Sequence, residues 1–213
     1  MRFPTIFIAF CLGLSSQTPP KQQPTENKGM PPRASVADYQ AHEKAGNITI
    51  AADFEAHSIA TPESTFTTDD YIAVEVAFYG PPGAHTEISP DQFSLRINGK
   101  KPLPGQPYGM VLGSAKDPDW QPPESSPSKS KTSLNSGGSG SDNSGPPPPV
   151  HVPIEVQHAM AVKIQKAALP EGDRVLPQAG MIFFRYSGNG KSIHSVELDY
   201  SGPAGKTTLD LQR

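Results

Sequence analysis

The chain has 213 residues, 35% of them apolar, which is enough for one substantial hydrophobic core. Its formal net charge of −3 argues against nucleic acid or an anionic membrane surface as a partner, because both require basic patches. Cys11 is the only cysteine. Cleavage of a leader that contains it would exclude disulfides and Cys-ligated zinc.

The first residues predict a secretory signal peptide. Arg2 precedes Phe3–Leu14, an apolar run that is too short to span a membrane. Gly13 and Ser15 are small residues at the positions that a signal peptidase requires, so we expect residues 1–15 to be removed and the protein to be secreted or periplasmic. Lipidation of Cys11 is an alternative that would anchor the chain to a membrane, although Phe10 stands where lipoproteins carry a small residue.

Residues 16–40 are expected to form a disordered tether, and residues 41–213 a single domain. The segment Gln17–Pro32 is polar, proline-rich and without periodicity, so it cannot bury enough apolar surface to offset the entropy of ordering. The segment Ser35–Ala45 has the composition of a short helical turn.

Alternation of apolar and polar residues predicts three strands in the first half of the domain. They cover Ile48–Phe54, Tyr71–Tyr79 and Phe93–Asn98. The polar segment Ser58–Asp70 between the first two is expected to be a loop.

A hairpin is expected directly after the third strand. Asn98-Gly99 is a strong signal for a type I′ turn, and Lys101–Leu103 would return as a short strand. Tyr108–Leu112 is expected to add another brief strand.

The stretch 121–149 differs in composition and consists mainly of Ser, Gly and Pro. We expect a disordered insertion within one domain, because the strands on either side are too few to form two sheets. A boundary between two domains is the alternative.

One helix is predicted, over Ile154–Ala168. Its apolar stripe consists of Val156, Met160, Ile164 and Ala167. The simpler interpretation is that this stripe packs on the sheet, and the alternative is that it binds a partner.

The C-terminal region predicts a β-meander. The segment Met181–Tyr186 is apolar on both faces, which is typical of a central strand covered on both sides. Two alternating segments follow it, with Val196 and Leu198 inward in one and Leu209 in the other.

Two motifs resemble those of an immunoglobulin-like domain family found in secreted bacterial proteins and lipoproteins. In the first, the inward residues Phe93 and Leu95 follow a Pro-Asp turn; in the second, Gly180, Phe183 and Phe184 follow a Leu-Pro turn. The resemblance covers about residues 48–112 and 175–211. It implies an all-β, immunoglobulin-like β-sandwich of about seven strands, here with one added α-helix and long disordered segments. It carries over no catalytic site.

The candidate catalytic and metal motifs are incomplete. Gly190-Lys191-Ser192 lacks the first glycine of a phosphate-binding loop and opens a strand, so no nucleotide is expected. The six histidines have no metal-ligand spacing, and His194 is expected to be partly buried at the start of a strand. The acidic pairs Asp69-Asp70 and Asp117-Pro118-Asp119 are typical of solvated loops.

We therefore predict a non-catalytic exported domain, with no cofactor and no metal, that binds a protein or a cell-envelope polymer such as a polysaccharide. Tyr79, Tyr108 and Trp120 are the aromatic residues expected near loops, where they could contact a partner or simply cap the ends of the sandwich. The alternative function is a small envelope hydrolase or metal-binding protein. A pocket that groups His57 and His85 with Asp69 or Asp70 would favour this alternative.

Overall fold

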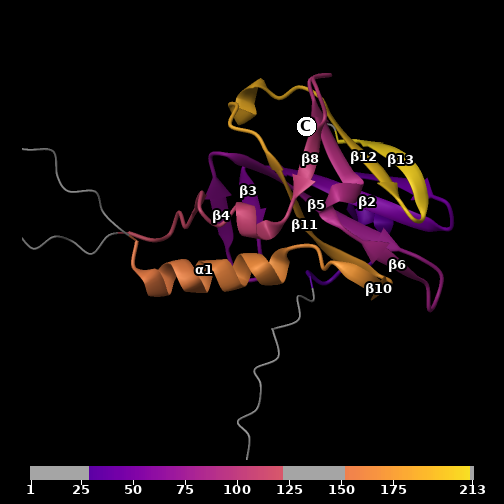
Figure 1. Cartoon of the computed structure of the whole chain (residues 1–213), viewed down its shortest axis with the longest axis horizontal. Helices are drawn as coiled ribbons and strands as arrows, with labels where there is room; N and C mark the ends of the chain where they lie inside the picture. Colours follow the sequence, from indigo (N-terminus) through magenta and orange to yellow (C-terminus); the bar gives the residue numbers. More distant parts are fainter. Residues whose placement is uncertain (1–28, 122–151, 212–213) are drawn as a thin grey trace, which may run out of the picture.

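The computed structural model describes residues 29–121 and 152–211. The predicted signal peptide, residues 16–28 of the predicted tether and nearly all of the predicted insertion lie outside these residues. The described chain is mostly β-structure with one α-helix, which confirms the predicted all-β class (Figure 1).

The strands are β1 (Ala41–Ala45), β2 (Ile48–Ala56), β3 (Ser58–Ala60), β4 (Thr65–Thr68), β5 (Tyr71–Tyr79), β6 (His85–Ile88), β7 (Phe93–Ile97), β8 (Leu103–Gln106), β9 (Ala115–Lys116), β10 (Gly172–Val175), β11 (Gln178–Arg185), β12 (Val196–Gly202) and β13 (Gly205–Asp210). The α-helix is α1 (Ile154–Ala167), and the 3₁₀ turns are η1 (Val36–Asp38), η2 (Pro90–Gln92), η3 (Tyr108–Met110) and η4 (Gly190–Ser192).

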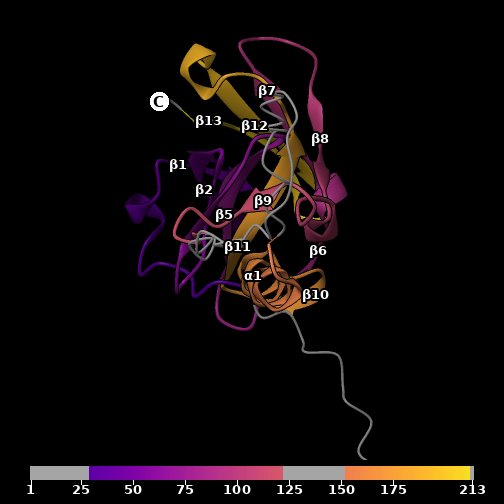
Figure 2. The same cartoon turned by 90° about the vertical axis from the view of Figure 1, so that its left-hand side faces the viewer.

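Eight strands form one sheet, in the order β1-β2-β5-β11-β8-β7-β12-β13. The sheet curls until its two end strands, β1 and β13, lie beside each other, so it is nearly closed like a barrel (Figure 2). Two small sheets, β10-β6 and β3-β4-β9, stand beside it. This arrangement differs from the predicted sandwich of about seven strands in two separate layers, because these eight strands belong to one hydrogen-bonded sheet.

The predicted strand over Tyr71–Tyr79 is β5 with the predicted bounds, and the one predicted over Phe93–Asn98 is β7, which ends one residue earlier. Their alternating residues point into the curled sheet, where an aromatic cluster forms: Phe93 lies 5.9 Å from Phe78 and 5.1 Å from Tyr200 between ring centroids. The interior is therefore a packed hydrophobic core and not a cavity.

The outer face of β5 and β11 is also buried, as the apolar composition of Met181–Tyr186 predicts. Met181 and Phe183 of β11 pack with Met160, Ile164 and Ala167 of α1. Phe66 of the small β3-β4-β9 sheet joins the same cluster. Helix α1 thus covers the outside of the barrel-like sheet through three of the four residues of the predicted stripe.

Several local predictions are wrong. The expected loop Ser58–Asp70 contains β3 and β4, whose Ile59 and Phe66 are buried under α1. The expected strand Tyr108–Leu112 contains the turn η3 instead. His194 is exposed, because the chain does not enter β12 until Val196.

The prediction of a disordered tether is wrong for residues 29–40, because this segment packs on the sheet. Met30 bridges to Ala179 of β11 by a 2.8 Å backbone hydrogen bond, and Tyr39 is 5% exposed. The helical turn expected within Ser35–Ala45 is η1, and the remainder of that segment forms β1.

Candidate functional site

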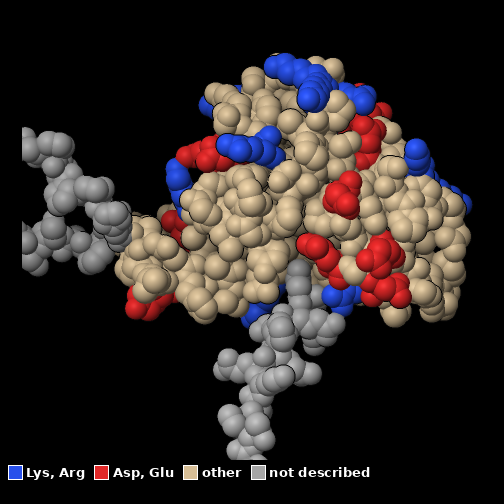
Figure 3. Space-filling model, viewed as in Figure 1, with Lys and Arg blue, Asp and Glu red and all other residues tan. Residues whose placement is uncertain are grey.

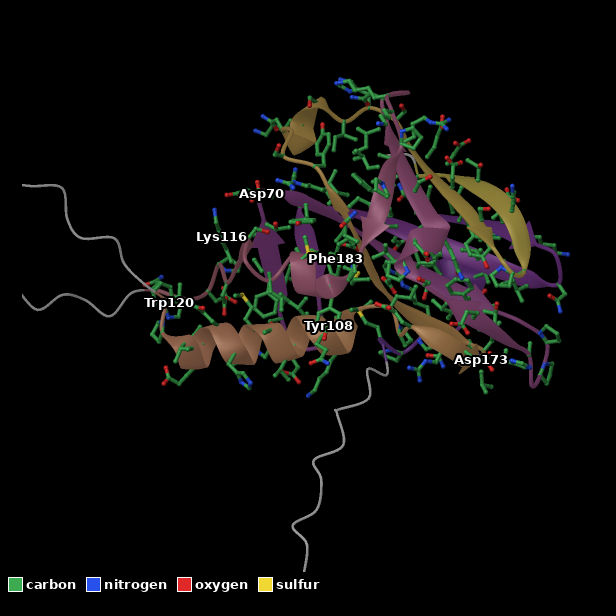
Figure 4. The ribbon with its side chains drawn as sticks, viewed as in Figure 1. Asp70, Tyr108, Lys116, Trp120, Asp173 and Phe183 are labelled. Atoms are coloured by element: carbon green, nitrogen blue, oxygen red, sulfur yellow. The ribbon has the colours of Figure 1, made fainter. Side chains whose placement is uncertain are left out.

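An apolar groove lies between the first half of α1 and the segment that carries β9. Its volume is about 830 Å³, within the size range of known ligand sites. The helix contributes one wall and the chain from Leu112 to Trp120 contributes the other (Figure 4). The helix wall is formed by Ile154, Val156, Met160 and Ala161, together with Val152 just before the helix.

The groove exists because α1 is longer than the surface that it covers. Met160, Ile164 and Ala167 are buried against the sheet, but the first turns of the helix project beyond β3-β4-β9. Ile154 is consequently 75% exposed, the largest exposed fraction among the large apolar side chains of the described residues. Val156, the first residue of the predicted stripe, lines the groove instead of the core.

The opposite wall is held in place by short-range hydrogen bonds. Val111 is fully buried, and its carbonyl oxygen accepts from the backbone N–H of Ala115 at 3.0 Å. The Ser114 hydroxyl lies 2.9 Å from that of Thr68 in β4. These contacts fix β9 at the edge of its sheet, where it pairs only with β4 among the described strands.

Trp120 closes one end of this wall, beside the start of α1 (Figure 4). The turn before it is set by Asp117, whose carbonyl oxygen accepts from the Trp120 N–H at 3.3 Å and whose side chain accepts from the Asp119 N–H at 3.0 Å. The polar residues that line the groove are Lys116, Asp117, Gln157 and His158. The Lys116 ammonium pairs with Asp69, and this hydrogen bond lowers the pKa of the Asp69 carboxyl.

The structure separates the three aromatic residues predicted to bind a partner. Trp120 lines the groove, whereas Tyr108 packs in the cluster beneath α1 next to the groove wall. Tyr79 lies elsewhere and serves the N-terminal segment. Its hydroxyl donates to the Arg33 carbonyl oxygen at 2.7 Å, and its ring stacks edge-on against Tyr39.

The histidines named for a hydrolase do not meet. The ring nitrogens of His57 lie 2.8 Å from the Tyr71 carbonyl oxygen and 2.9 Å from that of Gly188. His85 instead contacts Asp173, with 2.8 Å between Nδ1 and Oδ1. Asp69 pairs with Lys116, as described above.

One group of carboxylates in the described residues has the spacing of a metal site. Asp53 and Glu55 of β2 approach Glu75 of β5, with ligand oxygens within 4.8 Å of one another. Asp53 stands directly opposite Glu75, and a β-bulge after Phe54 turns Glu55 toward them.

A cation of the chain itself already bridges these carboxylates. Arg33 Nη2 lies 2.6 Å from Asp53 and 2.7 Å from Glu75. Burial raises the pKa of Glu55, and the charges of Glu75 and Asp53 raise it further. We therefore describe this group as an ion-pair cluster that fastens the N-terminal segment to the sheet.

Comparisons with known protein families, with curated proteins and with solved structures found no match to this chain. Within the described residues, no helix has the length and apolar character needed to cross a membrane. Because no similar protein suggests a function, the functional proposal below is based on the groove.

Sequence reasoning identified Trp120 but not the groove. The distance by which α1 overhangs the sheet depends on the fold of β3 and β4, which the sequence pattern did not reveal. The sequence held one signal for the groove, which was Ile154. This apolar residue at the start of the helix is not part of the stripe that packs on the sheet, so it indicated a second apolar surface on the helix.

Proposed function

We propose that the protein is a non-catalytic binding module whose groove binds an extended, apolar segment of a partner protein. The observation that carries the proposal is the groove of about 830 Å³, with apolar walls and a few polar side chains around it. This combination is typical of binding sites on protein surfaces. Met1–Ser15, which has the pattern of a signal peptide, supports placing this activity outside the cytoplasm.

The shape of the partner segment follows from the two walls. On one side the groove is bounded by β9, an edge strand with no further strand beside it in the described chain. An extended peptide can pair with such an edge through its backbone. Ile154, Val156 and Met160 on the other wall would receive its apolar side chains.

A protein segment matches these walls better than a polysaccharide does. Sugar-binding sites rely on aromatic rings that stack on the sugar and on many hydrogen-bonding groups. Among the residues that line the groove, Trp120 is the one aromatic, and the helix wall is aliphatic. The contacts of His57 and His85 away from the groove further support a binding function over hydrolysis.

The immunoglobulin-like assignment belongs to the same proposal. Inward Phe93 and Leu95 on β7, and Phe184 on β11, occupy the core positions that the resemblance implies. We propose that the chain is an elaborated member of this β-sandwich class in which the two layers have merged along one continuous sheet.

The proposal can be tested by selecting peptides. A library of random octapeptides would be selected on the immobilised full chain and counter-selected on the Ile154→Asp variant. We expect enriched sequences that share apolar residues at alternate positions. Synthetic versions should change the fluorescence of Trp120, the only tryptophan of the chain. Val175→Asp provides a matched control, because Val175 is also exposed, at 64%, but lies on β10.

Peptides that bind wild type and Val175→Asp but at least tenfold more weakly to Ile154→Asp would support the proposal. Failure to enrich any peptide, or equal binding to all three proteins, would contradict it. If the groove bound small apolar molecules but no peptide, the proposed partner class would be wrong.

A further inference from the structure

A second concave site lies between β6 and β10 on one side and the β1–β2 and β12–β13 turns on the other. Its volume is about 480 Å³. It is lined by polar residues from both small strands, including His85, Glu87 and Asp173, and by Asn47 and Ala204 from the turns. Strand β10 follows the C-terminal end of α1, whereas the apolar groove is at the helix's start, so the two sites are distinct (Figure 1).

We propose that His85, Glu87 and Asp173 form a binding site for a divalent metal ion of the zinc class. The strand register brings the three residues to one face of the β6–β10 pair. His85 and Glu87 are two residues apart on β6, and Asp173 of β10 stands directly opposite Glu87. Side chains that stand opposite or diagonally on one face of a ribbon lie within reach of a shared ion.

Two of the three proposed metal ligands are already in contact. His85 Nδ1 lies 2.8 Å from Asp173 Oδ1. Two ligands of a tetrahedral zinc ion, each about 2 Å from the metal, stand about 3.3 Å apart, so a small opening of this pair admits the ion between them. The Glu87 carboxylate does not yet have the spacing of a metal ligand to the other two, and a change of its rotamer would bring it to them.

The electrostatics of this surface favour a cation. Figure 3 shows acidic side chains gathered over β6 and β10, where Glu87, Glu171 and Asp173 are all exposed. Together the carboxylates of Glu87 and Asp173 balance the charge of a divalent ion, and a neutral imidazole is the commonest nitrogen ligand for zinc.

Calorimetric titration of the full chain with zinc chloride tests the proposal. We expect one ion per chain, and an affinity at least tenfold lower in each of His85→Ala, Glu87→Gln and Asp173→Asn. His85 and Asp173 are 64% and 63% exposed, so these variants should keep the fold and the thermal midpoint of the metal-free protein. His194→Ala, which removes another exposed histidine, should bind as the wild type does.

Ile154→Asp should also retain full zinc affinity, which separates this test from that of the groove. The proposal is overturned if the wild type binds no zinc, or if His85→Ala binds as tightly as the wild type. It is overturned equally if His194→Ala weakens binding as much as His85→Ala, because that result would indicate adventitious binding to surface histidines only.

Discussion

At the scale of single residues, Asn98 joins two parts of the barrel-like sheet. Its side-chain oxygen accepts from the backbone N–H groups of His194 and Ser195, at 2.8 and 3.1 Å, and its amide donates to the Ser192 carbonyl oxygen. The β7–β8 turn is thereby tied to the start of β12. Asn98 also has a positive φ of 50°, which asparagine adopts more readily than most residues.

Replacement of Asn98 separates these two roles. Asn98→Gly loses the three hydrogen bonds but adopts the positive φ easily, so we expect a loss of about 1–2 kcal/mol in the free energy of unfolding. Asn98→Ala adds backbone strain and should lose about 1 kcal/mol more. Urea unfolding measures both. A loss below about 0.5 kcal/mol in Asn98→Gly would show that the turn is not held by this side chain.

Glu55 makes the stability of the protein depend on pH. Its pKa is raised, first by burial and then by the nearby charges of Glu75 and Asp53. The folded state therefore binds a proton more readily than the unfolded state does. The stability contributed by protonated Glu55 is fully present below its unfolded pKa, about 4.3, and is lost as pH rises through the higher folded pKa.

We therefore expect Glu55→Gln to be more stable than the wild type at pH 7. The advantage should shrink as the pH falls toward 4, because the wild-type carboxyl is then protonated as well. Urea unfolding at a series of pH values measures the difference, and Glu43→Gln on the exposed face of β1 is the control. An advantage that did not change with pH would show that burial of the charge is not its cause.

At the scale of elements, α1 must be firmly docked if it is to form one wall of the groove. Ile164, which is fully buried, packs in the cluster with Met181 and Phe183 of β11. Truncation of such a side chain leaves a cavity and costs about 2–5 kcal/mol in the free energy of unfolding.

We expect this loss for Ile164→Ala, and a change within about 0.5 kcal/mol for Lys166→Ala, which alters an exposed residue of the same helix. Urea unfolding compares the two. If Ile164→Ala cost no more than Lys166→Ala, the helix would not be packed on the sheet and the groove would lack a wall.

The elements that the sequence predicted correctly are those with a strong period. Strand β7 alternates Phe93, Leu95 and Ile97 without interruption, and α1 repeats its apolar residues at helical spacing. Strands β3 and β4 escaped prediction because each is at most four residues long and contains a single large apolar residue, so neither shows an alternating pattern. Burial of Ile59 and Phe66 depends on α1 above them. The groove could not be predicted for the same reason.

At the scale of the whole molecule, the sheet closes where the turn after β1 meets the turn before β13. Gly46 has a φ of 63°, and a Cβ atom there would lie 2.3 Å from the Ala204 carbonyl oxygen. Strand β1 has no strong strand signal in its sequence, Ala41–Ala45, so this closure could not be read from the pattern. It depends on β1 pairing with β2 and then meeting β13.

Alanine substitutions test the closure. Gly83 has a similar φ of 78° with open space around it, so Gly83→Ala should cost only the backbone strain, about 1–2 kcal/mol in the free energy of unfolding. Gly46→Ala should cost at least about 1 kcal/mol more, because the methyl group also clashes with the opposing turn. Equal losses would show that β1 and β13 do not meet in solution.

The central claim is that the groove beside α1 is an open apolar binding site. The most direct test is a titration of the full chain with the dye 8-anilinonaphthalene-1-sulfonate, read by energy transfer from Trp120, which lines the groove. We predict one saturable site per chain, with affinity reduced at least tenfold in Ile154→Asp and unchanged in Val175→Asp. An absence of energy transfer from Trp120, or equal affinity in the wild type and Ile154→Asp, would contradict the account.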